Sequence, residues 1–248
     1  MDNVVRPVFI VGAPRSGTSL LRSIIDAHPN ICCPTWETGA FEKFDMILEG
    51  DITIRDEKDF AMPITRDDLL KWCRRSFDDL MLLLTGRIAK PRWAEKTPGH
   101  VFFIKLIHEV YPEAQFIHII RNGGEVVRSL QNMKWAPRKI RWSCSRWVDS
   151  VQAGRTAGSQ LSTDLYTEIR YEDLVADPAS NVQALCKFLG EPFAPQMLAF
   201  HEPANNSWGV DAKPLSAKPV NKYRELTLFE RFMLARVGGA LLRELGYR

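Results

Sequence analysis

Hydrophobic residues along the chain form short unbroken runs that alternate with stretches of helical periodicity. The segment 8–12 is apolar up to its closing glycine, and the segment 115–120 is a second run of this kind. Such runs predict strands that are buried on both faces, as in a parallel sheet. Residues 165–171 alternate well enough to predict a third strand, whereas the more polar segment 92–98 is predicted to be a short edge or loop element.

Helices are predicted where apolar residues recur every three or four positions, at 18–25, 101–110 and 137–158. Three more are marked by capping residues at their starts: Thr65 with Asp68, Asp177 with Pro178, and Thr227 with Glu230. Strands that alternate with helices predict an α/β fold, a mainly parallel sheet flanked by helices on both faces. No linker divides the chain, so residues 1–248 are predicted to form a single domain. Ligands of such sheets bind beyond the carboxyl ends of the strands.

Composition excludes several classes of protein. The chain has 248 residues, of which 45% are hydrophobic and 25% charged, as is usual for globular proteins. A net charge of +3 is too mild to indicate a nucleic-acid partner. No apolar run is long enough to span a bilayer, and the N-terminus lacks the pattern of a signal peptide. Five cysteines without a Cys-x-x-Cys pair argue against a disulfide framework and a zinc site, so a cytoplasmic location is predicted.

The loop after the first strand has the pattern of a phosphate-binding loop. Residues 12–19 fit G-x-x-x-x-G-x-[ST], but Thr18 stands where a nucleotide kinase has lysine. Two glycines before a helix N-terminus still provide backbone N–H groups for an anion. Arg15 supplies the positive charge, and Ser16, Thr18 and Ser19 add hydroxyl groups. The sheet is therefore predicted to be P-loop-like.

The magnesium ligands of an NTPase are missing from the expected place. The strand 115–120 ends in Arg121 rather than in an aspartate that could hold Mg²⁺. Without the lysine and the metal ligand, the site can neutralise less negative charge. It therefore suits the transfer of a group that carries less charge than a γ-phosphoryl group. A sulfuryl group meets that condition, and no metal is predicted.

Two motifs together resemble the sulfotransferases that use 3′-phosphoadenosine 5′-phosphosulfate (PAPS). The segment Pro14–Ser19 is similar to their 5′-phosphosulfate loop, and Arg121 with Ser129, eight residues later, is similar to their 3′-phosphate motif. The blocks 95–98, 170–174 and 218–221 also resemble this family, so the resemblance covers most of the chain. It implies that PAPS is bound by Pro14, Arg15, Ser16, Gly17, Thr18, Ser19, Arg121, Ser129, Tyr171 and Lys218. Lys218 lies in a proline-rich segment that is expected to fold over the nucleotide.

Within the superfamily, the loop and the segments that follow it are most similar to tyrosylprotein sulfotransferases. The shared features are the loop, Asp26–Pro29 and the pair Glu37–Thr38. In those enzymes the glutamate is the proposed base and an arginine follows the threonine, whereas Gly39 stands here. The acceptor is therefore predicted to be a hydroxyl or amine whose identity the sequence leaves open.

Three residues are candidates for catalysis. Lys96 is expected to stabilise the charge that builds on the bridging oxygen as sulfur leaves. Glu37 is the candidate general base, provided that the loop after the first helix returns to the phosphosulfate. His100, close to Lys96 in sequence, is the rival base, whereas His118 is expected to be a packed core residue.

Two other functions were weighed against sulfuryl transfer. A small-molecule kinase is opposed by Thr18 and by the missing strand-end aspartate. A nucleotide-binding module without catalysis would have no need of Lys96 and Glu37. Acceptor contacts are expected from the variable segments 36–63 and 135–147, while Trp135, Trp142 and Trp147 are expected to pack in the core.

Overall fold

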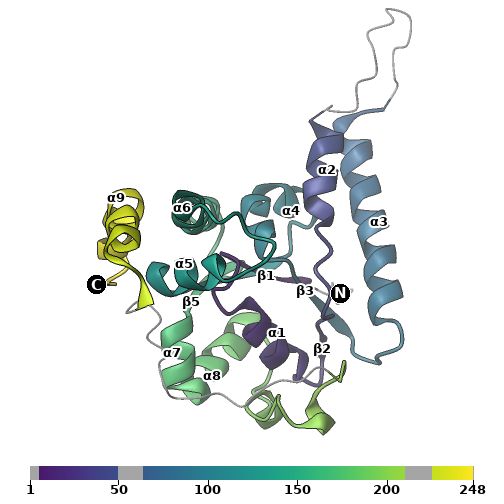
Figure 1. The fold of residues 1–248 in the computed structure, drawn as a ribbon. Coiled ribbons are helices and arrows are strands. Elements are labelled where there is room, and N and C mark those ends of the chain that lie inside the picture. The colour runs from purple at the N-terminus through teal and green to yellow at the C-terminus, as the bar shows by residue number, and fades with distance from the viewer. Residues whose placement is uncertain (1–5, 50–63, 210–224, 248) are drawn as a thin grey trace, which may run out of the picture.

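A parallel five-stranded sheet forms the centre of the molecule (Figure 1). The computed structural model describes residues 6–49, 64–209 and 225–247. The strand order is β2-β3-β1-β4-β5, and each neighbouring pair is parallel. The strands are β1 (Val8–Gly12), β2 (Ile31–Cys32), β3 (Arg92–Lys96), β4 (Gln115–Ile120) and β5 (Tyr166–Arg170). This confirms the predicted parallel α/β sheet.

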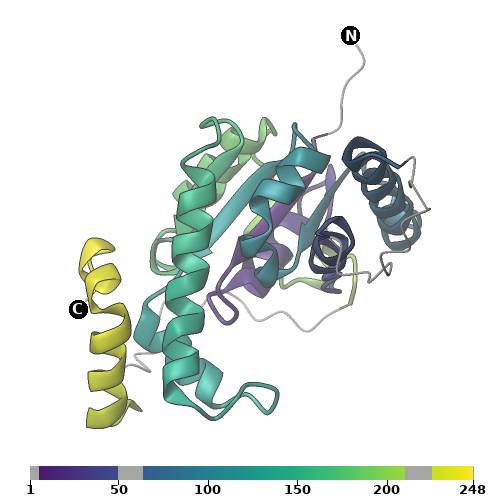
Figure 2. The same cartoon turned by 90° about the horizontal axis from the view of Figure 1, so that it is seen from above.

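Helices cover both faces of the sheet, as predicted (Figures 1 and 2). One face packs against α1 (Thr18–Asp26) and α8 (Pro178–Leu189), with α7 (Tyr171–Ala176) beside them. The other face is covered by α2 (Ala40–Leu48), α3 (Arg66–Thr85), the 3-10 turn η1 (Pro98–Phe102) and α4 (Ile104–Val110). A third apolar cluster joins α5 (Gly123–Gln131), α6 (Ile140–Gly158) and α9 (Leu228–Glu244). Two further 3-10 turns are η2 (Pro195–Met197) and η3 (Pro203–Asn205).

The prediction that residues 92–98 form an edge or loop element was wrong. The segment contains β3, an inner strand that pairs with β2 on one side and β1 on the other. Its charged residues are buried because each finds partners inside the protein. Arg92 donates to the side chain of Gln115 at 2.5 Å and to the carbonyl of Leu189 at 2.8 Å. Charged residues usually indicate a surface segment, but here they are buried and paired, so the sequence pattern did not reveal an inner strand.

Element ends follow the predicted caps more closely than the predicted periodicity. Capping boxes are present at Thr65 and at Thr227, and Gly190 ends α8 with a φ of 73°. The helix predicted at 101–110 is instead η1 followed by α4, with Phe103 between them. The helix predicted from residue 137 begins at Ile140. Neither β2 nor α2 was predicted.

The buried polar residues of the sheet include His118. Its side chain is fully buried in β4, as predicted, and its Nδ1 lies 2.7 Å from the hydroxyl of Tyr166. Burial, with a smaller contribution from Arg155, lowers the pKa of His118 to about 3. His118 is therefore a neutral core residue at ordinary pH.

Two findings bear on the compositional predictions. All five cysteines are buried and carry free thiols. Among the described residues, no helix combines the length and the apolar character that a membrane crossing requires.

Candidate active site

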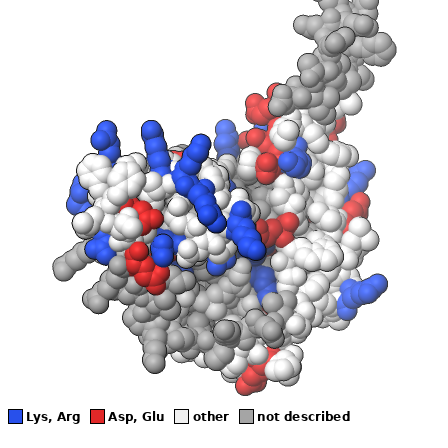
Figure 3. Space-filling model, in the orientation of Figure 1, with Lys and Arg blue, Asp and Glu red and all other residues white. Residues whose placement is uncertain are grey.

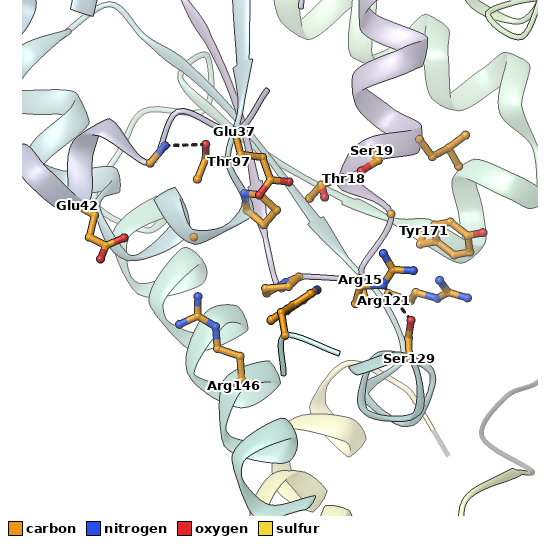
Figure 4. A pocket seen from close by; sticks show the side chains of 17 residues that line it. Arg15, Thr18, Ser19, Glu37, Glu42, Thr97, Arg121, Ser129, Arg146 and Tyr171 are labelled. Atoms are coloured by element: carbon orange, nitrogen blue, oxygen red, sulfur yellow. Dashed lines mark hydrogen bonds between the residues drawn. The ribbon is translucent and has the colours of Figure 1, made fainter. Parts of the chain in front are cut away.

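A pocket of about 750 Å³ opens at the carboxyl ends of β1, β3 and β4 (Figure 4). The loop after β1, the residues after β3 and Arg121 after β4 all reach it, as predicted for a parallel sheet. Its walls are formed by Pro14, Arg15, Gly17, Thr18, Ser19, Leu20, Glu37, Gly39, Glu42, Thr97, Pro98, Gly99, Arg121, Ser129, Trp135, Arg146 and Tyr171.

The loop between β1 and α1 is held in a conformation that requires its glycines. Gly12 and Gly17 have φ values of 149° and 106°, and Arg15 also has a positive φ of 74°. A Cβ atom on Gly12 would lie 2.5 Å from the carbonyl oxygen of Ile119, and one on Gly17 would lie 2.4 Å from the Tyr171 ring. No side chain caps the N-terminus of α1. Its first N–H groups therefore remain donors for an anion.

Two arginines and a serine gather at one end of the pocket (Figure 4). Arg15 donates through Nε to the hydroxyl of Ser129 at 3.0 Å, although 114 residues separate them. Arg121 lies over the ring of Tyr171, 4.0 Å from its centre. The predicted residues of the 5′ and 3′ motifs thus meet at one place.

Within the described part of the chain, two buried polar atoms near this end lack a hydrogen-bond partner. They are Oγ of Ser16 and Nε of Arg121. Leaving such an atom buried and unpaired costs about 1–3 kcal/mol. A bound anion could supply Arg121 with the missing acceptor, so the residues fit a phosphorylated ligand. Ser16 itself does not line the pocket.

Glu37 and Lys96 form an ion pair between β3 and the loop that follows β2. The Lys96 side chain is 4% exposed, whereas that of Glu37 is 52% exposed and lines the pocket. The loop after α1 therefore returns to the pocket, the condition on which the prediction for Glu37 depended. Lys96 does not itself line the pocket and is connected to it through this ion pair.

A buried carboxylate, Glu95, holds this loop in place. It accepts hydrogen bonds from the Thr38 backbone N–H at 3.3 Å, the Thr38 hydroxyl at 3.1 Å and the Thr97 hydroxyl at 2.5 Å. Its other oxygen lies 2.9 Å from Nδ1 of His100. Burial opposes ionisation of Glu95, but His100 and these hydrogen bonds outweigh it and lower its pKa. No role for the Glu95 carboxylate in holding this loop was predicted from the sequence.

His100 lies behind the pocket rather than in its wall. Its side chain is fully buried, and its ring packs edge-on against Phe41 with centres 5.3 Å apart. Nδ1 is engaged by Glu95, and His100 is not among the residues that line the pocket. Lys218, the remaining predicted contact, lies outside the described residues.

The far wall of the pocket contains residues of the segments 36–63 and 135–147, from which acceptor contacts were expected. Glu42 of α2 and Arg146 of α6 line it, together with Trp135. The prediction that three tryptophans pack in the core holds for Trp147, which is fully buried. It was wrong for Trp135, which is 60% exposed and contributes to the pocket, with Trp142 edge-on beside it.

No group of three or more His, Cys, Asp or Glu side chains that could hold a metal ion occurs in residues 6–49, 64–209 and 225–247. The charged groups in the pocket wall are Arg15, Arg121, Arg146, Glu37 and Glu42. The pocket therefore offers cationic contacts for a phosphorylated ligand and one carboxylate paired with a buried ammonium.

Comparison with known proteins identifies the family. The model of a family described as "Sulfotransferase family" matches residues 7–195, which include the loop, both arginines and the Glu37–Lys96 pair. The chain belongs to the sulfotransferase family. This confirms the resemblance that the motifs indicated.

Curated relatives of this sulfotransferase are distant in sequence. A putative protein-tyrosine sulfotransferase of Caenorhabditis briggsae is 25% identical, over 89% of this chain and 78% of that protein. The protein-tyrosine sulfotransferase of Drosophila melanogaster is 24% identical, over 86% of this chain and 45% of its own length. An omega-hydroxy-beta-dihydromenaquinone-9 sulfotransferase of Mycobacterium tuberculosis is 24% identical, over 74% of this chain and 62% of that protein. This chain thus spans less than two thirds of the last two proteins.

Solved structures share the fold. The sulfotransferase domain from the curacin biosynthetic pathway has a TM-score of 0.69 at 19% identity and covers 99% of each chain. The sulfotransferase domain of the Synechococcus PCC 7002 olefin synthase has a TM-score of 0.67 at 21% identity, over 96% of this chain and 97% of that one. A mouse sulfotransferase, SULT7A1, complexed with PAP has a TM-score of 0.57 at 16% identity, over 96% of this chain and 84% of that chain.

Proposed function

We propose that this sulfotransferase transfers a sulfuryl group from PAPS to a hydroxyl or amine acceptor. The observation that carries the proposal is the arrangement of a single pocket. Arg15, Arg121 and Ser129 form one end, termed here the nucleotide end, and Glu37, Glu42 and Arg146 form the acceptor end (Figure 4). Cations for a bisphosphate nucleotide and a candidate base thus share one cavity.

The nucleotide end suits a ligand with two separate phosphorus groups. The N-terminus of α1 and Arg15 would bind the 5′-phosphosulfate, because backbone N–H groups and the guanidinium converge there. Arg121 and Ser129 would bind the 3′-phosphate, for which a planar guanidinium offers paired hydrogen bonds. The ring of Tyr171 beneath Arg121 fixes the plane of that guanidinium.

The chemical step proposed here uses Glu37 and Lys96. Glu37 takes the proton from the acceptor hydroxyl, and the acceptor oxygen forms a bond to sulfur as the bond from sulfur to the 5′-phosphate oxygen breaks. Lys96 stabilises the charge that develops on that leaving oxygen. The products are the sulfated acceptor and adenosine 3′,5′-bisphosphate (PAP). Glu37 is preferred to His100 because it lines the pocket and His100 does not.

Phosphoryl transfer has weaker support. Thr18 occupies the position of the kinase lysine, and β4 is followed by Arg121 rather than by a carboxylate. A nucleotide-binding module without catalysis does not account for the ion pair between Glu37, which lines the pocket, and the buried Lys96 behind it.

The acceptor is proposed as a hydroxyl compound in the first place. The relatives named above act on tyrosine or on an omega-hydroxy menaquinone, and both acceptors present a hydroxyl group. Lys218 as a nucleotide contact, one domain for residues 1–248, and a cytoplasmic location remain predictions. The free thiols of all five cysteines suit a reducing compartment.

Calorimetry of the wild-type protein tests the proposal. PAP should bind in the absence of divalent metal, and 5′-AMP should bind at least about tenfold more weakly than PAP. ATP with Mg²⁺ should not displace bound PAP. Incubation with PAPS and a panel of phenols, alcohols and amines then seeks a sulfated product. Equal affinity for PAP and 5′-AMP would contradict the proposal that PAPS is the donor.

A further inference from the structure

Arg146 is a cation at the acceptor end that the reaction described above does not use. It projects from α6 into the wall of the pocket, and its guanidinium lies over the ring of Phe102 at 4.7 Å from the ring centre. In the described part of the chain, no carboxylate reaches it at ion-pair distance and no hydrogen bond engages it. The side chain is therefore held by stacking while its N–H groups stay available.

The surroundings of Arg146 make an unpaired guanidinium costly. Burial lowers its pKa, which means that its charge is partly removed from water. The carboxylates that face it are Asp149, on the same helix, and Glu42, on α2. Both attract it through space without bonding to it. A desolvated charge of this kind is stabilised most by an anion that completes its hydrogen bonds.

The charge around this wall also favours an anionic ligand. Residues 126–148 contain six cations and no aspartate or glutamate: Arg128, Lys134, Arg138, Lys139, Arg141 and Arg146. Lysine and arginine side chains gather on the face formed over α5, α6 and α9 (Figure 3). Of these six cations only Arg146 lines the pocket, whose wall also contains Glu37 and Glu42. The other five lie outside the pocket, where an excess of positive charge raises the local concentration of anions.

We infer that Arg146 binds an anionic group of the acceptor, so that the substrate class is a hydroxyl compound bearing a carboxylate or a similar anion. The inference rests on the proposed function, because the acceptor must share the pocket with the donor. Arg146 lies away from Arg15, Arg121 and Ser129, which gather at the opposite end (Figure 4). The anion that it binds therefore belongs to the acceptor rather than to the nucleotide.

The aromatic surfaces beside Arg146 suggest suitable probes. Phe102 stacks on the guanidinium and Trp135 lines the same pocket. The experiment saturates the protein with PAP, which occupies the nucleotide end, and titrates 4-hydroxyphenylacetate and 4-hydroxyphenylacetamide separately by calorimetry. The two probes differ in charge and share the ring and the hydroxyl group.

The expected result is a preference of wild type for the acid over the amide of about tenfold, the value of one charge-assisted contact. Arg146→Met should abolish this preference and Arg146→Lys should retain part of it. Arg141→Met, which removes an exposed cation of the same helix outside the pocket, should keep it in full. PAP affinity measured on each variant reports folding and separates this test from that of the donor.

Two outcomes would overturn the inference. One is equal binding of the acid and the amide by the wild type, including an absence of binding by both. The other is an Arg146→Met variant that binds PAP normally and still prefers the acid. If PAP itself fails to bind the wild type, the proposed function fails first, and the two failures are thereby distinguished.

Discussion

At the nucleotide end of the pocket, the binding groups come from two short segments, residues 14–19 and 121–129, each at the carboxyl end of a central strand. At the acceptor end they come from four separate places: the loop after β2, α2, the residues after β3, and α6 with the segment before it. The first is built by local chain geometry, the second by tertiary packing.

This difference bears on how firmly each end is held. The nucleotide end rests directly on the sheet, since Gly12 lies against β4 and Gly17 against Tyr171. The acceptor end depends on side-chain contacts, the hydrogen bonds that Glu95 accepts from Thr38 and Thr97. Donor binding should therefore tolerate changes at the acceptor end, while catalysis should not.

The strongest test of this separation is Glu37→Gln. Loss of a positioned base typically lowers turnover by about a hundredfold to ten-thousandfold. PAP affinity should stay within about twofold of wild type, since Glu37 makes no contact with Arg15 or Arg121. Single-turnover transfer from PAPS and calorimetry with PAP measure the two quantities.

Glu49→Gln, an exposed change at the end of α2, serves as the control for Glu37. If Glu37→Gln stays active and His100→Ala is inactive with normal stability, the base is the histidine.

Lys96→Ala should have the next largest effect. Removing one donor that stabilises a developing oxyanion costs about a hundredfold to a thousandfold in kcat. Because that charge develops in the transition state, the KM for PAPS should change less than kcat. Steady-state kinetics with Lys105→Ala, an exposed lysine of α4, as the control measure the split. A raised KM at unchanged kcat would make Lys96 a nucleotide anchor.

Glu95→Gln tests the contact that holds the acceptor end. An amide retains the size of the carboxylate but loses its charge and one acceptor site, so the loop carrying Glu37 should shift. A misplacement of about 1 Å can cost up to about a hundredfold in rate, and we expect about ten- to a hundredfold in kcat with PAP affinity unchanged.

The matched control for Glu95 is Glu113→Gln, which removes a carboxylate paired with Arg74 far from the pocket. It should lower stability in urea but leave kcat unchanged. If Glu95→Gln does the same, its role is structural only.

The sequence was sufficient to predict which residues gather at the nucleotide end because the signals there are local. Glycines at positive φ, a strand-end arginine and a serine eight residues later are determined by consecutive residues. The prediction of Glu37 needed a family resemblance, since nothing local shows that its loop returns to the pocket.

The acceptor end was harder to predict because its residues acquire meaning only through contacts. Glu95 is interpretable only once Thr38 and His100 are known to surround it. In the sequence Arg146 resembles an ordinary exposed helix cation, and only the structure shows that its guanidinium stacks on Phe102. The same reason explains why β3 was mistaken for an edge: the partners of Arg92 lie 23 and 97 residues away.

Arg121→Ala probes the nucleotide end. The variant should bind PAP roughly tenfold more weakly or worse, while 5′-AMP affinity should change little, because the contact proposed for Arg121 is to the 3′-phosphate. Calorimetry with both nucleotides measures this ratio. Arg138→Ala, an exposed cation outside the pocket, should leave both affinities unchanged. An equal loss for the two nucleotides would show that Arg121 does not read the 3′-phosphate.

The smallest expected effect on activity concerns how the acceptor wall is joined to the sheet, because the quantity that changes is the dependence of folding stability on pH. His118 of β4 packs against Gly154 of α6, the helix that carries Arg146, where a Cβ atom would lie 2.4 Å from the ring. Burial lowers the pKa of His118 to about 3 in the folded protein, whereas the ordinary value is 6.5. The unfolded chain therefore binds the extra proton first as the pH falls below 6.5, and folding stability is lost progressively between 6.5 and about 3.

Each pH unit inside that window should cost about 1.4 kcal/mol from this residue alone, or about 2 kcal/mol between pH 6.5 and pH 5. Urea denaturation of wild type and His118→Gln at these two pH values measures the difference in slope. The variant should be less stable at neutral pH, since it disturbs the contact with Tyr166, but its stability should depend less on pH. If the stability of wild type and variant changes equally with pH, His118 is protonated in the folded state. The contact between β4 and α6 would then not be the acid-sensitive part of the acceptor wall.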